Sequence, residues 1–153
     1  CALPISEMVS GVDLIKSQIL VAAGEPLSFK QEDLVCTGHA IECRINAEDP
    51  SKGFRPNPGM IKKFFAPGGI GVRFDSHVYG GYSVPPYYDS MIAKLIVYRP
   101  TREEAISTMR RALKEMQVEG IETTAAFHDM VLQHKDFIEG QHDTKWVERE
   151  LMD

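Results

Sequence analysis

Few residues in this chain could do chemistry, and a charged pair on one β-prone run comes first. Arg73 and Asp75 alternate with Val72 and Phe74, so the charged side chains face one way if the apolar ones face the interior. An arginine on a strand is most often a solvated or ion-paired surface residue. The spacing alone therefore gives Arg73 no catalytic role.

A second candidate is the segment VPPYYDSM at residues 84–91. Its two prolines fix backbone φ angles, and its two tyrosines bring large surfaces with a polar end. This composition suits either a rigid ledge beside a site or plain packing, and the spacing does not decide between them. Asp89 and Lys94 could pair with charges across a sheet, although a surface ion pair contributes little to stability.

Other familiar chemistries lack support in the sequence. No two of the five histidines have the i, i+4 spacing of a helical metal site, and the three cysteines show no CxxC spacing, so we expect no metal site built from this chain alone. The glycines within residues 68–71 could cradle a phosphate, but no helical pattern follows them, which favours a tight hairpin turn. No serine nucleophile elbow, Walker A motif or GxGxxG sequence occurs.

The composition is that of an ordinary globular domain. The 153 residues are 43% hydrophobic, and 17 basic against 22 acidic residues give a formal net charge of -5. That balance argues against a nucleic-acid surface or an anionic-membrane anchor. No apolar run approaches the roughly 20 residues that a membrane span needs, and the N-terminus lacks the layout of a signal peptide. We therefore expect a soluble, cytoplasmic protein in a reducing compartment.

The elements that must position these residues follow from periodicity. Apolar residues at spacings of three and four predict one amphipathic helix over residues 7–23, which Gly24 and Pro26 end. Alternation in GHAIECRINAED predicts a strand with one buried side and one wet or site-facing side. The buried side holds Ile41, Cys43 and Ile45, and the other holds Ala40, Glu42, Arg44 and Asn46. Prolines and glycines predict a rigid loop at residues 49–59.

Further strands and then helices complete the pattern. Runs at residues 60–66, 71–75 and 91–98 predict a small, mostly antiparallel sheet. A capping box from Thr101 to Glu104 begins a helix that Gly120 ends. Its expected buried stripe is Ile106, Met109, Leu113 and Met116. Thr123 or Thr124 could cap a helix that buries Phe127, Met130 and Val131, and a last short helix holds Trp146, Val147 and Leu151. This order predicts an α+β fold.

Several long segments, in order, resemble one enzyme family. GHAIECRINAEDP at residues 38–50, PNPGMI at 56–61 and FFAPGGIGVRFDSHVYGGYSVPPYYDSMIAKLIVY at 64–98 are similar to the C-terminal part of biotin carboxylases. The resemblance covers nearly the whole chain and is nearest to the free-standing bacterial subunit of acetyl-CoA carboxylase. Propionyl-CoA, methylcrotonyl-CoA and pyruvate carboxylases carry related segments.

The resemblance implies an ATP-grasp ligase of fatty acid synthesis. Such enzymes use ATP and Mg²⁺ or Mn²⁺ to activate bicarbonate, and they then carboxylate biotin on a carrier protein. Implied partners are the biotin carboxyl carrier protein, the carboxyltransferase subunits and a second copy of the full-length protein. By resemblance, Arg73 binds bicarbonate and the ureido oxygen of biotin, which suits a guanidinium because its fixed fork stays charged and pairs with oxyanions. Thr144 would lie near the nucleotide.

The resemblance also divides the chain. Residues 1–30 would be the end of an ATP-grasp domain, residues 36–143 the biotin carboxylase C-terminal domain, and residues 144–153 a terminal helix. In the family the ligands for the metal and most of those for ATP lie upstream of a stretch such as EHPVTEM, to which Glu7 and Met8 match here while Cys1, Ala2 and Leu3 do not. We expect Ala2 to Ile5 to be non-native, since a translated sequencing adapter reads the same, and this fragment alone to be inactive. The alternatives are a non-catalytic module that binds a subunit or carrier, and another ATP-grasp ligase.

Overall fold

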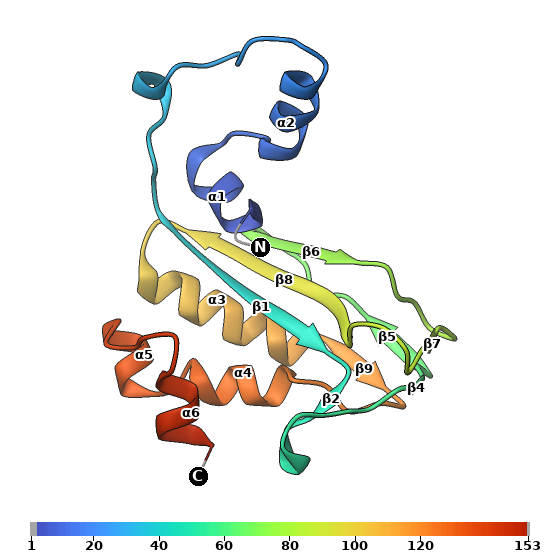
Figure 1. The fold of residues 1–153 in the computed structure, drawn as a ribbon. Coiled ribbons are helices and arrows are strands. Elements are labelled where there is room, and N and C mark those ends of the chain that lie inside the picture. Colours follow the sequence, from blue (N-terminus) through green and yellow to red (C-terminus); the bar gives the residue numbers. More distant parts are fainter. Residues whose placement is uncertain (1–2, 153) are drawn as a thin grey trace.

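A mixed sheet-and-helix body carries two helices at its N-terminal end (Figure 1). The computed structural model describes residues 3–152. Its main sheet is antiparallel, with strand order β1-β8-β6, and consists of β1 (His39–Asn46), β8 (Met91–Arg99) and β6 (Val72–Ser76). Helix α3 (Arg102–Glu115) covers one face of this sheet, and α1 (Leu3–Ser10) lies against the other. The α+β prediction is confirmed.

The core lies between the sheet and α3. Ile41, Cys43 and Ile45 are all buried, as the alternation predicts, and Cys43 pairs across the sheet with Leu95. The expected stripe of α3 is buried as well: Ile106, Met109, Leu113 and Met116. Burial of a large aliphatic side chain contributes about 1.5–3 kcal/mol, so this layer supplies much of the stability of the domain.

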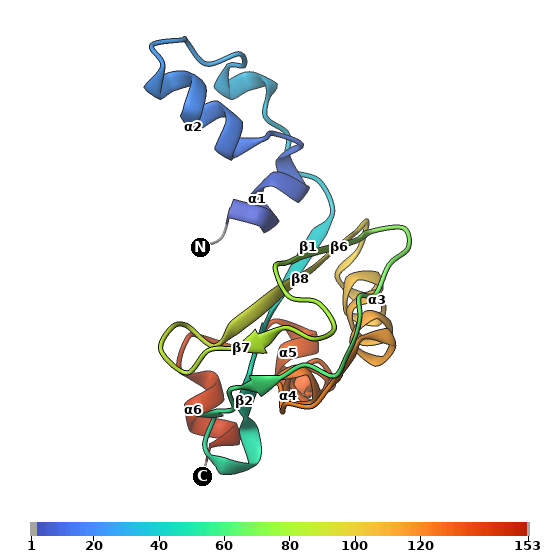
Figure 2. The same ribbon diagram turned by 90° about the vertical axis from the view of Figure 1, so that its right-hand side faces the viewer.

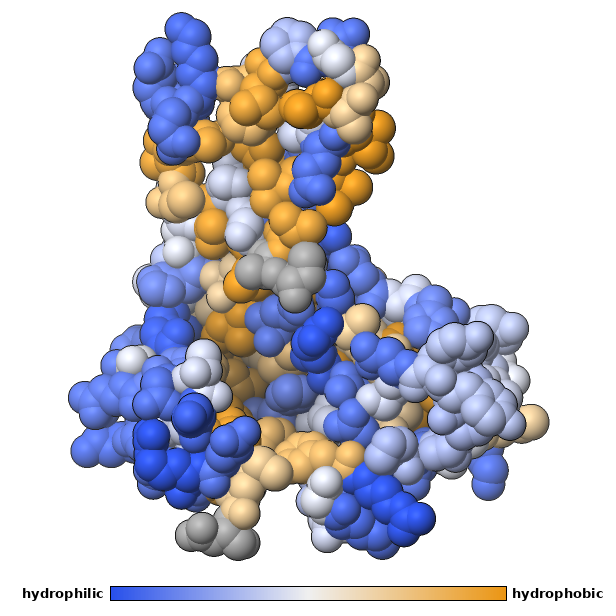
Figure 3. All heavy atoms as spheres, viewed as in Figure 1, coloured by the Kyte–Doolittle hydropathy of each residue, from blue (hydrophilic) through white to orange (hydrophobic). Residues whose placement is uncertain are grey.

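The N-terminal segment corrects the prediction of one helix. It forms α1 and a separate α2 (Leu14–Ala22), because Gly11 adopts a left-handed φ of 71° and Asp13 begins the second helix by accepting from the backbone N–H of Lys16 at 2.8 Å. Helix α2 buries no residue. Its apolar side chains are exposed, among them Ile15, Ile19 and Val21, and Figure 3 shows hydrophobic residues gathered on this upper part of the molecule.

Short strand pairs surround the main sheet. Three two-stranded ladders join β2 (Glu48–Asp49) to β3 (Arg55–Pro56), β4 (Gly59–Met60) to β7 (Ser83–Val84), and β5 (Lys63–Phe65) to β9 (Gln117–Glu119). The loop expected at residues 49–59 therefore contains paired residues, together with a 3-10 turn, η2 (Pro50–Lys52). Another such turn, η1 (Gln31–Asp33), lies between α2 and β1.

The glycine-rich segment at residues 68–71 is a turn but not a hairpin. It connects β5 to β6, and these strands belong to different sheets. Gly71 has a φ of 78°, and a Cβ atom built on it would lie 2.5 Å from the carbonyl oxygen of Tyr98. Glycine is therefore required here because the backbone passes too close to β8 for any side chain.

The start of α3 confirms half of the expected capping box. The hydroxyl of Thr101 accepts from the backbone N–H of Glu104 at 3.2 Å. The carboxylate of Glu104 lies 3.9 Å from Nε of Arg99 instead of completing the box. The helix ends at Glu115 rather than at Gly120, because the residues between them form β9.

The C-terminal helices depart further from expectation. Helix α4 (Ala125–Val131) follows Thr124, whose side chain makes no cap bond because it binds β1 instead. Met130 is exposed and Leu132 is the residue buried there. An unpredicted helix, α5 (Lys135–Glu139), precedes α6 (Trp146–Leu151), whose Trp146 is buried as expected.

Figure 2 shows α2 projecting away from the sheet beyond α1, with the segment that contains η1 leading back to β1. That polar segment coincides with the predicted domain boundary, and the division into domains stays a prediction. No helix within residues 3–152 is both long and apolar enough to cross a membrane.

Candidate functional site

The face of the main sheet opposite α3 gathers the charged residues of three strands. Strand register places side chains of paired residues on the same side of a sheet. Glu42, Ile96 and Arg73 form one row across β1, β8 and β6, and Arg44, Lys94 and Asp75 form the next. We call these six residues the open face. Ile96 is fully buried although it lies on this face, because α1 packs over it and its neighbours.

Arg73 is held by two carboxylates. Its Nε donates to both oxygens of Asp75 at 3.0 Å, and its Nη1 donates to Oε2 of Glu7 at 3.0 Å. Hydrogen bonds that the guanidinium donates to Asp75, and then to Glu7, raise its pKa above the usual value. The expectation that Arg73 and Asp75 share a face is confirmed, and the charge of Arg73 is compensated within the described part of the chain.

Glu7 connects this arginine to the N-terminal helices. Its Oε2 binds Arg73, while its Oε1 accepts from the backbone N–H of Leu14 at the start of α2 at 3.2 Å. Its side chain is only 15% exposed. Between α1, α2 and β6 lies an open groove of about 680 Å³, lined by Glu7, Arg73, Met8, Ile15 and Lys16 among others. The groove brings the partly buried carboxylate of Glu7 and the cation of Arg73 together beside apolar side chains.

Arg44 is the second guanidinium of the open face, and the sequence reasoning did not single it out. Its residue is exposed on β1, opposite Lys94. Among residues 3–152, no hydrogen bond or ion pair engages its side chain, in contrast to that of Arg73. The signal was the alternation that placed Arg44 on the site-facing side of its strand. An exposed, uncompensated guanidinium can pair with a carboxylate or a similar oxyanion of a ligand.

Two buried acceptors on β1 accompany Arg44. Oε2 of Glu42 and Oδ1 of Asn46 are buried and have no hydrogen-bond partner among the described residues. Nδ2 of Asn46 donates to Glu48 at 3.1 Å, and the hydroxyl of Ser90 also donates to Glu48. A buried acceptor without a donor costs stability, so these oxygens suit a site where a ligand or water supplies the donor.

The proline-tyrosine segment forms a ledge at one end of the sheet. Tyr87 and Tyr88 are 86% and 83% exposed, whereas Val84 is buried. Asp89 accepts from the backbone N–H of Met91 at 2.9 Å, so it shapes the turn into β8 and makes no ion pair with Lys94 within the described residues. A pocket of about 260 Å³ lies beside the ledge, lined by prolines, Tyr88 and Ser90. The tyrosines project outward, which favours the ledge over plain packing.

Thr144 does not join this site. It is exposed two residues before α6, which lies with α4 and α5 on the helical side of the sheet, away from α1 (Figure 1). The neighbouring Asp143 accepts from the backbone N–H of Lys145 at 2.9 Å. That bond shapes the turn that leads into α6. The hydroxyl of Thr144 makes no hydrogen bond within the described residues. Its place beside a nucleotide stays a prediction.

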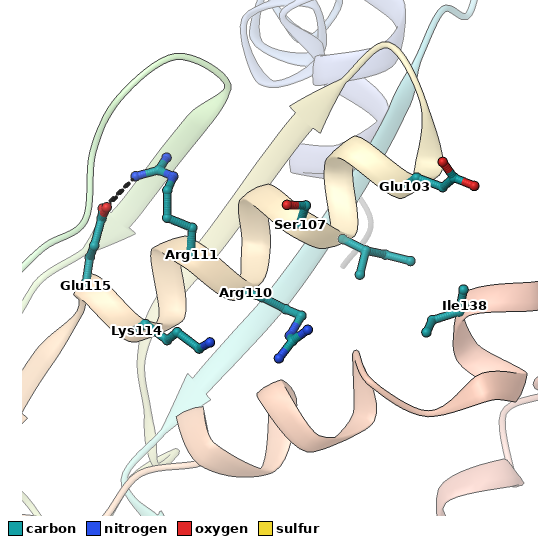
Figure 4. Close-up of a pocket in the computed structure, with 8 residues that line it drawn as sticks. Glu103, Ser107, Arg110, Arg111, Lys114, Glu115 and Ile138 are labelled. Carbon is teal, nitrogen blue, oxygen red and sulfur yellow. Dashed lines mark hydrogen bonds and ion pairs between the residues drawn. The ribbon is translucent and has the colours of Figure 1, made fainter.

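The helical side carries a second groove, of about 530 Å³, between α3 and α5 (Figure 4). Its cations are largely compensated: Arg110 pairs with Asp129 at 2.9 Å, and Arg111 pairs with Glu115 at 2.6 Å. Within residues 3–152, no group of three or more His, Cys, Asp or Glu side chains could hold a metal ion. The open face is therefore the better candidate for binding an anion.

Comparison with known proteins identifies the family to which this chain belongs. The family model for the biotin carboxylase C-terminal domain matches residues 42–149. The chain belongs to this family. It is 61% identical to "Biotin carboxylase 1" of Bacillus subtilis over 95% of its length and 32% of that protein. It is also 53% identical to a pyruvate carboxylase subunit of Methanothermobacter thermautotrophicus, over 95% of the chain and 30% of that protein.

Solved structures agree with the sequence relatives. The biotin carboxylase domain of a thermophilic 2-oxoglutarate carboxylase, bound to bicarbonate, matches with a TM-score of 0.93 and 46% identity. That match covers 95% of this chain and 33% of the other. The chain thus spans about a third of the length of the curated relatives that it matches.

Proposed function

We propose that this chain is part of an ATP- and bicarbonate-dependent biotin carboxylase, which carboxylates biotin on a carrier protein. The observation that carries the proposal is the family match over residues 42–149, supported by the high structural similarity to a bicarbonate-bound biotin carboxylase domain. The open face suits this activity because both bicarbonate and the developing ureido oxygen of biotin are anionic acceptors that guanidinium groups bind well.

The structure offers two arginines for the anion. Arg73 is the residue that the resemblance indicates, but Asp75 and Glu7 already compensate its charge. Arg44 lies on the same face without such a partner among residues 3–152. We therefore propose Arg44 for direct contact with the anion and keep Arg73 as the second candidate, which would bind the anion only after one of its carboxylates moves away.

The proposal also includes ATP, a divalent metal ion and protein partners. ATP and Mg²⁺ or Mn²⁺ would supply the phosphoryl chemistry that activates bicarbonate. The described residues contain no cluster for the metal, so we propose that its ligands, and most of those for ATP, lie in the part of the relatives outside the match. Thr144 is proposed as a neighbour of the nucleotide. The carrier protein, the carboxyltransferase subunits and a second copy are the proposed partners.

The most specific part of the proposal is the molecule that receives the carboxyl group from biotin. We propose the biotin carboxylase subunit of acetyl-CoA carboxylase, hence fatty acid synthesis, because the long segments of the chain resemble that subunit and the chain is 61% identical to "Biotin carboxylase 1" of Bacillus subtilis. Relatives named as pyruvate and 2-oxoglutarate carboxylases share the fold and a large part of the sequence. Only pairing with each carboxyltransferase distinguishes the pathways.

The test is to express the complete reading frame that contains this chain and to supply MgATP, bicarbonate and biotinylated carrier protein. We expect ADP formation that depends on bicarbonate, together with acid-labile label from bicarbonate on the carrier. A complete protein that binds the carrier without hydrolysing ATP would instead identify a non-catalytic module and refute the proposal.

A further inference from the structure

Thr124 and His128, at the start of α4 and within it, form hydrogen bonds with the free edge of β1 near the end of that strand. β1 is an edge strand of the main sheet, so every second residue directs its backbone groups away from β8. The hydroxyl of Thr124 accepts from the backbone N–H of Asn46 at 3.0 Å and donates to the carbonyl of Arg44 at 3.0 Å. The backbone N–H of Thr124 donates to the carbonyl of Asn46 at 3.1 Å.

A histidine one turn further along α4 adds a second donor. Nε2 of His128 lies 2.8 Å from the carbonyl oxygen of Arg44. Because a carbonyl only accepts, this nitrogen carries the proton. The carbonyl of Arg44 thus receives two side-chain donors, one from the N-cap residue of α4 and one from α4 itself, and Thr124 is only 4% exposed. The contact joins residues that are 80 and 84 positions apart in the chain.

The contact lies where β1 is least regular. The pairing of β1 with β8 shifts between Ile45 and Asn46. A strand that carries such an irregularity bends and twists locally, so its ladder alone does not fix the direction of the side chains beside it. The hydrogen bonds that the side chains of Thr124 and His128 make with the backbone of β1 lie on both sides of this shift. They hold Arg44 before it and Asn46 after it.

We propose that Thr124 and His128 are positioning residues, which fix the backbone of Arg44 so that its guanidinium points from the open face in one direction. The inference rests on the proposed role of Arg44 in binding the anion. The side chains of both residues bind the backbone of β1 and not the open face, so both act through the strand. A shift of about 1 Å in a group that holds a substrate costs as much as 100-fold in rate, so this anchor has a kinetic consequence.

The competing explanation is that Thr124 only satisfies the polar groups of an edge strand, which every fold must do. That role predicts lower stability and no specific effect on the reaction. The two explanations separate when the Thr124 change is made both in the parental enzyme and in one without the Arg44 guanidinium, because residues that act through one another are not additive.

The experiment uses the complete carboxylase and the variants Thr124→Val, Thr124→Ser, Arg44→Ala and the double variant Thr124→Val/Arg44→Ala. Thr123→Val is the matched control, since Thr123 carries the same hydroxyl one residue earlier and accepts only from Ala125 at 3.5 Å. The readouts are kcat/KM for bicarbonate and the melting temperature. If Thr124→Val does not fold, His128→Leu takes its place in the cycle.

We expect Thr124→Val to lower kcat/KM about 10-fold or more, and Thr124→Ser and Thr123→Val to stay within about twofold of the parent. In the Arg44→Ala background the same valine should change kcat/KM less than about twofold while still lowering the melting temperature. Equal losses in both backgrounds, or full activity of Thr124→Val, would overturn the inference alone. Full activity of Arg44→Ala would overturn the role of Arg44 and the inference with it.

Discussion

The carboxylate of Glu7 lies 3.0 Å from Nη1 of Arg73, and this ion pair joins residues 66 positions apart in the chain. It fastens α1 to β6 beside the open face. Because the second oxygen of Glu7 binds the first backbone N–H of α2, one side chain connects three elements. The relationship between this carboxylate and this arginine determines whether Arg73 is free to bind a ligand.

The first prediction concerns the anchoring by Glu7. In the complete protein, Glu7→Gln should lower the free energy of unfolding by about 1 kcal/mol, because it weakens a partly buried, charge-assisted pair and leaves the Arg73 bond to Asp75 intact. Urea denaturation measures the difference. Glu25→Gln is the control, since Glu25 is exposed and its side chain makes no hydrogen bond or ion pair within residues 3–152. Equal stabilities for all three proteins would show that the pair contributes nothing.

The second prediction separates the two arginines. Arg44→Ala should reduce carboxylation of the carrier by about 100-fold and leave the melting temperature within a few degrees, because the exposed side chain has no structural partner among the described residues. Arg73→Ala should lower both, because it leaves the partly buried carboxylate of Glu7 without its cation. Steady-state kinetics and calorimetry on the same preparations decide. A larger kinetic loss in stable Arg73→Ala would return the anion contact to Arg73.

The sequence predicts those structural features that depend on residues close together in the chain. The alternation of Ile41, Cys43 and Ile45 identified the buried side of β1 because burial on one face of a strand repeats every second residue. The break at Gly11 was missed because the apolar spacing continues through it, although the local turn ends the helix. Strand β9 was missed because its three residues are stabilised by pairing with β5, from Lys63↔Glu119 to Phe65↔Gln117, and not by their own pattern.

The same distinction applies to the site. That Arg73 and Asp75 share a face is local, and the sequence predicts it. The engagement of Arg73 by Glu7 is a contact across the fold, so periodicity contains no trace of it. Thr124 shows the converse. Its position predicted a helix cap, but its hydroxyl binds the backbone of β1 instead. The backbone groups at the free edge of β1 need hydrogen-bond partners, and this hydroxyl supplies them.

A third prediction concerns thiol reactivity. Burial, with a smaller contribution from the charge of Glu42, raises the pKa of the Cys43 thiol to about 12, whereas Cys36 is exposed. Since the thiolate is the nucleophile, Cys43 should resist alkylation at pH 7.5 and Cys36 should be labelled. Mass spectrometry of peptides after brief iodoacetamide treatment measures both sites. Labelling of both in denaturant is the control, and rapid labelling of Cys43 in the folded protein would contradict its burial.

The last prediction concerns acid stability and His128. Desolvation lowers the pKa of its imidazole below the usual value of 6.5, and the hydrogen bond to the Arg44 carbonyl opposes this only in part. The unfolded chain therefore binds a proton at a higher pH than the folded one does, so stability falls as the pH drops through 6.5. The loss levels off only below the lowered pKa of the folded state, where both states are protonated.

Replacement of this histidine tests the assignment. His128→Gln retains a donor for the carbonyl of Arg44 but does not titrate, so its melting temperature should fall less than that of the parent between pH 7.5 and pH 5.5. His39→Gln, at an exposed histidine on β1, should keep the parental dependence. If His128→Gln and the parent lose stability in parallel, another group must be responsible for the acid sensitivity, and His128 must already be solvated in the folded protein.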